Sequence, residues 1–262
     1  MRRPATFFPI FLLTIGALVL APSGGARADA PGEGPIEIDK CQTISHSGSY
    51  KLVNNISELT TNGIPGGNCL VITAGFVTID LAGFSIGFDR GIGVFSQDSG
   101  ITVRNGSISA SRGTAVLLNG DGSIVEGLYI NLTQASGISA KGIVRGNTIT
   151  TFLPGDTGIS ASGSITDNYV NGAATFPPAV GTRLITGISA EGTVRGNTVL
   201  NSERGLIVSP GSTVIGNTVT GNSVTGIEAN CPANLTDNTA VNNGTNLVLS
   251  GSGCNNTNNV AP

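Results

Sequence analysis

Two aspartates that could work as a pair occupy similar places in this chain. Asp98 stands in the segment QDSGI and Asp121 in the segment GDGSI. If Ile101 and Ile124 stack in neighbouring units, the two carboxylates lie about 5 Å apart, the separation used by retaining glycosidases. The same pair, with Asn119, could hold calcium. Both segments are also ordinary turn sequences, and we favour this structural interpretation.

The remaining residues suited to chemistry are few. His46 is the only histidine and precedes the repeats described below, which excludes histidine acid or base chemistry on them. The chain has no tryptophan, and Tyr129 and Tyr169 are the only tyrosines within the repeats, so aromatic platforms for a carbohydrate are scarce. Lys141 lies near the aspartate pair on the following unit.

These residues are positioned by a repeated phrase. The sequence GISA begins at Gly137, Gly158 and Gly187, and looser copies begin at Gly205 and Gly226. Self-similarity at a spacing of about 20 to 25 residues is typical of a solenoid, in which each unit stacks on the one before.

Each unit contains three short β segments joined by turns, with no helical period after the N-terminus. Strands of this length without a helical crossover close as a parallel β-helix. We therefore predict an all-β, single-stranded parallel β-helix. Aligning one residue of the first strand in each coil gives about nine coils, with the aligned residues Leu70, Ile92, Thr114, Ile138, Ile159, Ile188, Leu206, Ile227 and Leu247.

Two further columns follow from the same alignment. A second inward ladder is expected at Ile108, Ile130, Ile149, Val170, Val199 and Val219. An asparagine column, which we interpret as structural because stacked amides satisfy one another, is expected at Asn147, Asn168, Asn197, Asn217 and Asn238.

The phrases CLVIT at 69–73, VTIDLAGF at 77–84 and VRGNT at 144–148 resemble secreted repeat proteins of the pectate-lyase-like superfamily over roughly residues 36 to 260. The resemblance implies a right-handed β-helix, in line with the general preference for right-handed crossovers. Polygalacturonase-like members carry N-T-D, D-D, G-H-G and R-I-K motifs, and this chain has none of them.

Four cysteines predict two disulfides. Cys231 and Cys254 are one coil apart, so they should lie over each other near the C-terminal end. Cys41 and Cys69 bracket the entrance to the first coil and form the expected second pair. A zinc site is the alternative, but the chain has no C-x-x-C pair or histidine partner for it.

The N-terminus has the pattern of a secretory signal peptide: a basic start, an apolar run from Phe7 to Ala21 and a small-x-small site ending at Ala28. We therefore expect a signal peptide at 1–28, an N-terminal cap segment at 29–68, the β-helix at 69–254 and a C-terminal tail at 255–262. Removing residues 1–28 leaves 10 basic and 16 acidic residues, a net charge of −6, which disfavours a nucleic-acid partner. A secreted or periplasmic protein without a membrane span in its mature form is expected.

Charged residues form one further column, Asp80, Arg104, Glu126 and Arg145, whose alternating signs predict pairing on a solvated face. Arg195 differs, because its column neighbours are Thr166 and Ile215.

Arg183 and Phe176 lie in the longest coil, where an excursion interrupts the repeat. Such loops are where solenoids usually place specificity, so Arg183, Arg195 and Phe176 are the candidate ligand surface.

The complete fold pattern without a complete catalytic set favours a non-catalytic exported scaffold, structural or binding a polysaccharide or envelope component. The alternative is a polysaccharide lyase or glycoside hydrolase acting on an acidic glycan at Asp98 and Asp121 or at Arg195. No cofactor is expected beyond calcium at the two aspartates.

Overall fold

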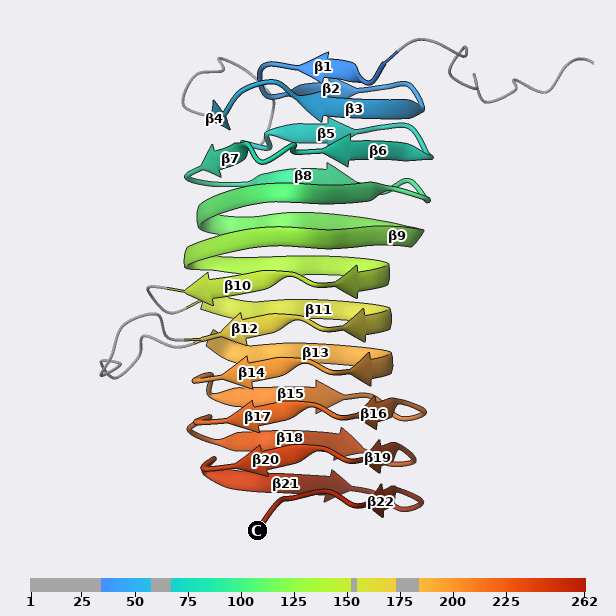
Figure 1. Ribbon diagram of the computed structural model, residues 1–262, viewed down its shortest axis with the longest axis vertical. Coiled ribbons are helices and arrows are strands. Elements are labelled where there is room, and N and C mark those ends of the chain that lie inside the picture. Colours follow the sequence, from blue (N-terminus) through green and yellow to red (C-terminus); the bar gives the residue numbers. More distant parts are fainter. Residues whose placement is uncertain (1–33, 58–66, 152–154, 173–183) are drawn as a thin grey trace, which may run out of the picture.

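The computed structural model describes residues 34–57, 67–151, 155–172 and 184–262. In these ranges every regular secondary-structure element is a β-strand. The strands stack in parallel as a β-solenoid of about eight turns (Figure 1). The predicted all-β parallel solenoid is confirmed, with a turn count close to the nine expected. Since the described residues form no helix, they contain none that could cross a membrane.

Each turn contributes strands to three stacks, and each strand pairs in parallel with strands of the turns before and after. The first stack contains β2 (Gln42–Ile44), β5 (Leu70–Ile72), β8 (Ile92–Ser96), β15 (Arg204–Val208), β18 (Thr225–Asn230) and β21 (Thr245–Ser250). The second contains β1 (Ile36–Ile38), β3 (Gly48–Leu52), β6 (Val77–Asp80), β16 (Thr213–Ile215), β19 (Asn234–Thr236) and β22 (Asn255–Thr257).

The third stack contains β4 (Ile56–Ser57), β7 (Ser85–Phe88), β10 (Thr148–Thr151), β12 (Tyr169–Asn171), β14 (Thr198–Leu200), β17 (Thr218–Thr220) and β20 (Thr239–Val241). Three long strands pass through more than one stack without a break: β9 (Thr102–Arg145), β11 (Gly155–Thr166) and β13 (Leu184–Arg195).

The core is a set of aliphatic ladders running along the axis. Alternate residues of each strand point inward, so one residue type repeats from turn to turn. The register confirms the ladder Ile138, Ile159, Ile188, Leu206, Ile227, Leu247 and the ladder Ile130, Ile149, Val170, Val199, Val219.

The prediction was wrong by two residues in the early turns. Leu70 pairs with Val94 rather than Ile92, and Val94 pairs with Val116 rather than Thr114. The segment GIGV offers two glycine-aliphatic pairs, and the second is the true counterpart of the repeat. A Cβ at Gly93 would lie 2.6 Å from the backbone O of Ala115, so the turns approach too closely there for any other residue.

The buried asparagine column forms the expected ladder. The Nδ2 of Asn147 donates to Asn168 Oδ1, and this pattern continues from turn to turn to Asn259. The left-handed bend lies at the residue before each asparagine, with a φ between 55° and 64° at Gly146, Asp167, Gly196, Gly216 and Asp237.

Both predicted disulfides are present. Cys41 bonds Cys69 and Cys231 bonds Cys254, with Cα–Cα distances of 4.5 and 5.0 Å. Each bridge joins neighbouring turns near one end of the solenoid, where the outermost strands have an unpaired edge.

The rod extends beyond residues 69–254 at both ends. Strands β1 to β4 of the expected cap segment pair with one another or with the turns that follow, and β22 of the expected tail pairs with β19. The predicted signal peptide, residues 1–28, lies outside the described residues.

Candidate functional site

An open groove lies on the first stack. Its volume is about 280 Å³, and the outward side chains along it include Ser139, Ser160, Ser189, Lys141 and Glu191. A second hollow of about 320 Å³ shares Lys141, Ser162 and Glu191 and continues to Asp121. We call the combined feature the serine groove.

The groove follows from the size of the residues in one outward column. Ser139, Ser160 and Ser189 stack over one another in β9, β11 and β13, and the next residue of the column is Ile207. Glu228 follows Ile207. Three small side chains on successive turns therefore leave the surface lower than the turns after them, and the repeated GISA phrase itself creates the hollow.

The adjacent outward column carries the charges of the groove. Lys141 pairs in register with Ser162, and Ser162 pairs with Glu191. The two charged residues stand two turns apart, about 9.6 Å along the axis. Neither forms an ion pair with a described residue, so both can contact a ligand. The serine side chains are half-exposed or exposed, and their hydroxyls make no hydrogen bond with a described residue.

Glycines form one edge of the groove. Gly142, Gly163 and Gly192 stack with positive φ values of 143°, 126° and 111°. A Cβ at any of them would lie 2.2 to 2.4 Å from a backbone oxygen of the preceding turn. This edge therefore has no side chains, which keeps the groove open beside Lys141 and Glu191.

The two aspartates of the sequence hypothesis are offset by one residue. Ser96 pairs with Leu118, and a Cβ at Gly120 would lie 2.1 Å from the backbone O of Asp98, so Asp98 lies beside Gly120 rather than Asp121. The alignment of Ile101 with Ile124 was wrong, because the buried inward residue after this turn is Ser123, whose hydroxyl donates to Gly120 O at 2.9 Å.

Asp121 lines the groove beside Lys141, whereas Asp98 is not among the residues lining it. Within the described ranges no three His, Cys, Asp or Glu side chains cluster as metal ligands. A catalytic or calcium-binding role for Asp98 and Asp121 stays a prediction.

Of the three residues proposed as a ligand surface, the structure describes only Arg195. It is exposed, its register neighbours are Thr166 and Ile215 as expected, and it forms no ion pair with a described residue. It lies at the end of β13 in the second stack and does not line the serine groove. Arg183 and Phe176 fall outside the described residues.

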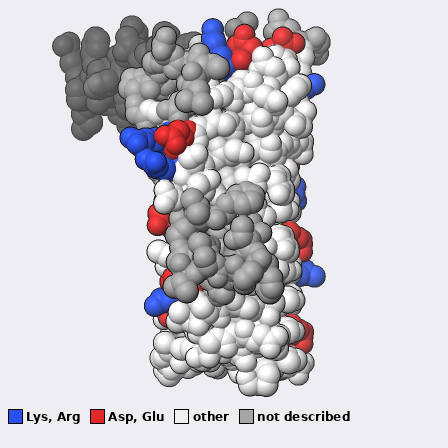
Figure 2. All heavy atoms as spheres, turned by 90° about the vertical axis from the view of Figure 1, so that its left-hand side faces the viewer, with Lys and Arg blue, Asp and Glu red and all other residues white. Residues whose placement is uncertain are grey.

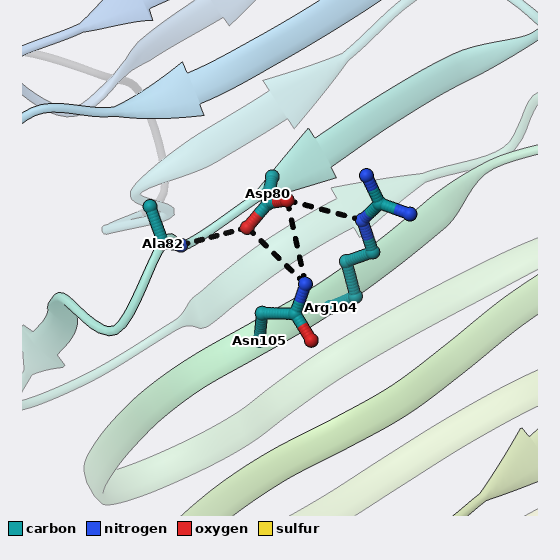
Figure 3. A network of polar contacts seen from close by, with 4 residues as sticks. All are labelled: Asp80, Ala82, Arg104 and Asn105. Carbon is teal, nitrogen blue, oxygen red and sulfur yellow. Dashed lines mark hydrogen bonds and ion pairs between the residues drawn. The ribbon is translucent and has the colours of Figure 1, made fainter.

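The predicted column of alternating charges forms two ion pairs on the second stack. The Nε of Arg104 donates to Asp80 Oδ2 at 3.2 Å, and the Nε of Arg145 donates to Glu126 Oε2 at 2.7 Å. Asp80 also accepts a 2.8 Å hydrogen bond from the backbone N of Ala82 and contacts from Asn105, so it closes the turn after β6 (Figure 3). These charges are satisfied within the protein, which favours a structural role for the column.

The groove residues Ser139, Ser160, Ser189 and Glu191 were not singled out from the sequence. The signal was present: an outward serine recurs at one position of three successive units, while later units have Ile207 and Glu228 there. Periodicity identifies such a column, but the depth of the groove depends on the neighbouring turns.

Comparison of the chain with protein-family models, with curated proteins and with solved structures found no match. What the site can do is therefore argued from its own geometry.

Proposed function

We propose that this protein is an exported scaffold, similar to the β-helices of the pectate-lyase-like superfamily, that binds a polysaccharide or another hydroxyl-bearing envelope component in the serine groove without converting it. The observation that carries this proposal is a row of serine hydroxyls on three successive turns that make no hydrogen bond with a described residue, flanked by Lys141 and Glu191.

The donor and acceptor types suit a polyhydroxylated ligand. A serine hydroxyl both donates and accepts, an ammonium group only donates, and a carboxylate only accepts. Lys141, Glu191 and Asp121 therefore offer both kinds of partner beside the serines. Because the groove follows the axis, a polymer lying along the rod meets the same hydroxyl once per turn, about every 4.8 Å.

Binding is favoured over turnover by how the polar groups are arranged. Covalent catalysis by a serine needs a base within hydrogen-bond reach of its hydroxyl. No described residue forms such a bond with Ser139, Ser160 or Ser189. Figure 2 shows the side of the rod that lies left in Figure 1, where most of the Lys, Arg, Asp and Glu side chains in view lie toward the edges of the described surface.

Export is supported by two features. The N-terminal pattern is that of a signal peptide, and the two disulfides, which involve all four cysteines, fit an oxidising compartment. A secreted or periplasmic location is thus part of the proposal.

The test is binding of the purified exported protein to polygalacturonate, alginate, cellulose oligosaccharides and chitin oligosaccharides, with and without calcium. Ser160→Val with Ser189→Val introduces β-branched, strand-compatible side chains and removes two hydroxyls. We expect affinity to fall about tenfold, since each lost hydrogen bond contributes about 0.5 to 1.5 kcal/mol. The matched control is Thr236→Val, on β19 of the second stack, which should bind like the wild type.

Two results would contradict the proposal. One is an affinity for the bound glycan that is unchanged in the double serine variant. The other is release of shortened or unsaturated products by the wild type, abolished by Asp121→Ala, which would establish the lyase or hydrolase alternative.

A further inference from the structure

The third stack brings together the two tyrosines of the repeats. Tyr129 pairs in register with Thr148, and Thr148 pairs with Tyr169, which in turn pairs with Thr198. The tyrosines thus occupy one outward column, two turns or about 9.6 Å apart. Their side chains are 47% and 37% exposed.

These are the largest outward residues of the described third stack. The residue between them and the next in the column are threonines, so each ring stands beside a smaller neighbour. Neither phenol hydroxyl bonds a described residue. An exposed ring with a polar tip is suited to a ligand that has both apolar surface and hydroxyl groups.

A polar column runs beside the tyrosines. Asn131, Thr150 and Asn171 pair in register, followed by Leu200. The hydroxyl of Thr150 donates to Asn131 Oδ1 at 2.8 Å, which leaves the amide nitrogen of Asn131 as a donor. Ring faces and hydrogen-bonding groups therefore lie in parallel columns on the same flat surface.

The described strands of this surface carry no charge. The described third-stack strands, namely β4, β7, β10, β12, β14, β17, β20 and the β9 segments 107–110 and 129–132, contain no Lys, Arg, Asp, Glu or His. An acidic polymer would find no partner for its charges on these strands, whereas a neutral polymer needs none. Charge complementarity thus selects an uncharged ligand, unlike the serine groove on the first stack.

We propose that Tyr129 and Tyr169 form a second binding surface, for a neutral polysaccharide whose extended chain lies along the rod. One pyranose ring stacks its C–H face on each tyrosine, and the sugar between them lies over Thr148. The 9.6 Å interval is close to the disaccharide repeat of an extended β-linked chain. Asn131 and Thr150 supply hydrogen bonds to the hydroxyl edges of the sugars.

The experiment is a pull-down of the purified exported protein with insoluble cellulose, chitin and β-1,3-glucan, and affinity electrophoresis in soluble neutral glucan and polygalacturonate. The variants are Tyr129→Ala with Tyr169→Ala, and Tyr129→Phe with Tyr169→Phe. The control is Val224→Ala, an exposed residue between β17 and β18. Thermal unfolding and circular dichroism of every variant establish that it is folded.

We expect the wild type to bind at least one neutral glycan. Polygalacturonate should bind the tyrosine face no more tightly than that neutral glycan does. The double alanine variant should lose about tenfold or more in affinity, because it removes both ring faces. The double phenylalanine variant should retain most of it, and the control all of it. The double serine variant of the groove should keep its affinity for a neutral glycan that the double alanine variant no longer binds, which separates the two surfaces.

Failure to bind any neutral glycan overturns the inference. So does undiminished binding by a folded double alanine variant, or loss of neutral-glycan binding in the serine variant alone. None of these outcomes removes binding in the serine groove, and the last would place the neutral glycan there. The proposed function is therefore judged separately, by its own serine variants.

Discussion

Asn197 offers a sharp test of how the turns are held together. Its side chain is 1% exposed and satisfies several buried groups. Its Oδ1 accepts from the backbone N and the Nδ2 of Asn168, both at 3.0 Å. Its Nδ2 donates to Ile165 O at 2.9 Å and to Asn217 Oδ1 at 3.0 Å.

Replacement of Asn197 by alanine should cost about 2 to 6 kcal/mol. The backbone N of Asn168 and the carbonyl of Ile165 lose these partners in the interior, and each buried unsatisfied group costs about 1 to 3 kcal/mol. Water cannot replace the amide without entering the packed core.

The matched control is Asn259, the last residue of the same ladder. It accepts from Asn238 at 2.8 Å and donates to Leu235 O at 2.8 Å, but it is half-exposed. Water can take over its contacts, so Asn259→Ala should cost no more than about 1 kcal/mol.

The assay is urea unfolding of both variants, followed by circular dichroism. Because stacked turns can unfold in parts, a second probe such as intrinsic tyrosine fluorescence should accompany it. Equal destabilisation by the two substitutions, or a loss below about 1 kcal/mol for Asn197→Ala, would refute the view that the buried amides hold the turns together.

Two further predictions concern the turns and the ends of the rod. Gly163→Ala should lower stability by at least about 3 kcal/mol, because the new Cβ would lie 2.2 Å from Gly142 O. Gly216→Ala, whose Cβ would have no atom within 4 Å, should cost only the strain of its left-handed backbone, about 1 to 2 kcal/mol. Thermal unfolding of both variants checks this ranking, and equal losses of stability contradict it. Replacing either cystine by two serines should lower the free energy of unfolding by about 3.5 kcal/mol, because the closed loops span 28 and 23 residues. Chemical unfolding with and without reductant checks this. A wild type whose stability is the same with and without reductant would contradict it.

The sequence predicted the architecture well because the fold repeats. Inward aliphatic residues and asparagines recur at each turn, so Ile138, Ile159 and Ile188 align without further information. Alignment failed where the repeat is ambiguous, at Ile92 beside Val94 and at Ile124 beside Ser123. Periodicity alone does not separate two candidates one or two residues apart; backbone contact between turns does.

The site was harder to predict for a physical reason. The serine groove depends on differences between turns, such as serine at Ser189 and isoleucine at Ile207, rather than on what the turns share. The tyrosine face likewise depends on register, since Tyr129 and Tyr169 are far apart in sequence and share a column only because each lies outward in the third stack, on either side of Thr148. The tyrosine face has no motif, and the recurring serine of GISA indicates a groove only when it is compared with the turns that lack it.

The central claim is that the serine groove binds a glycan without converting it. The most direct measurement is a calorimetric titration of the polysaccharide retained in the binding screen into the wild type and into the protein carrying Ser160→Val and Ser189→Val. The account predicts saturable binding that weakens about tenfold in the variant, with heats that show no continuing reaction. Equal affinity in the two proteins, or a sustained heat of turnover, would contradict it.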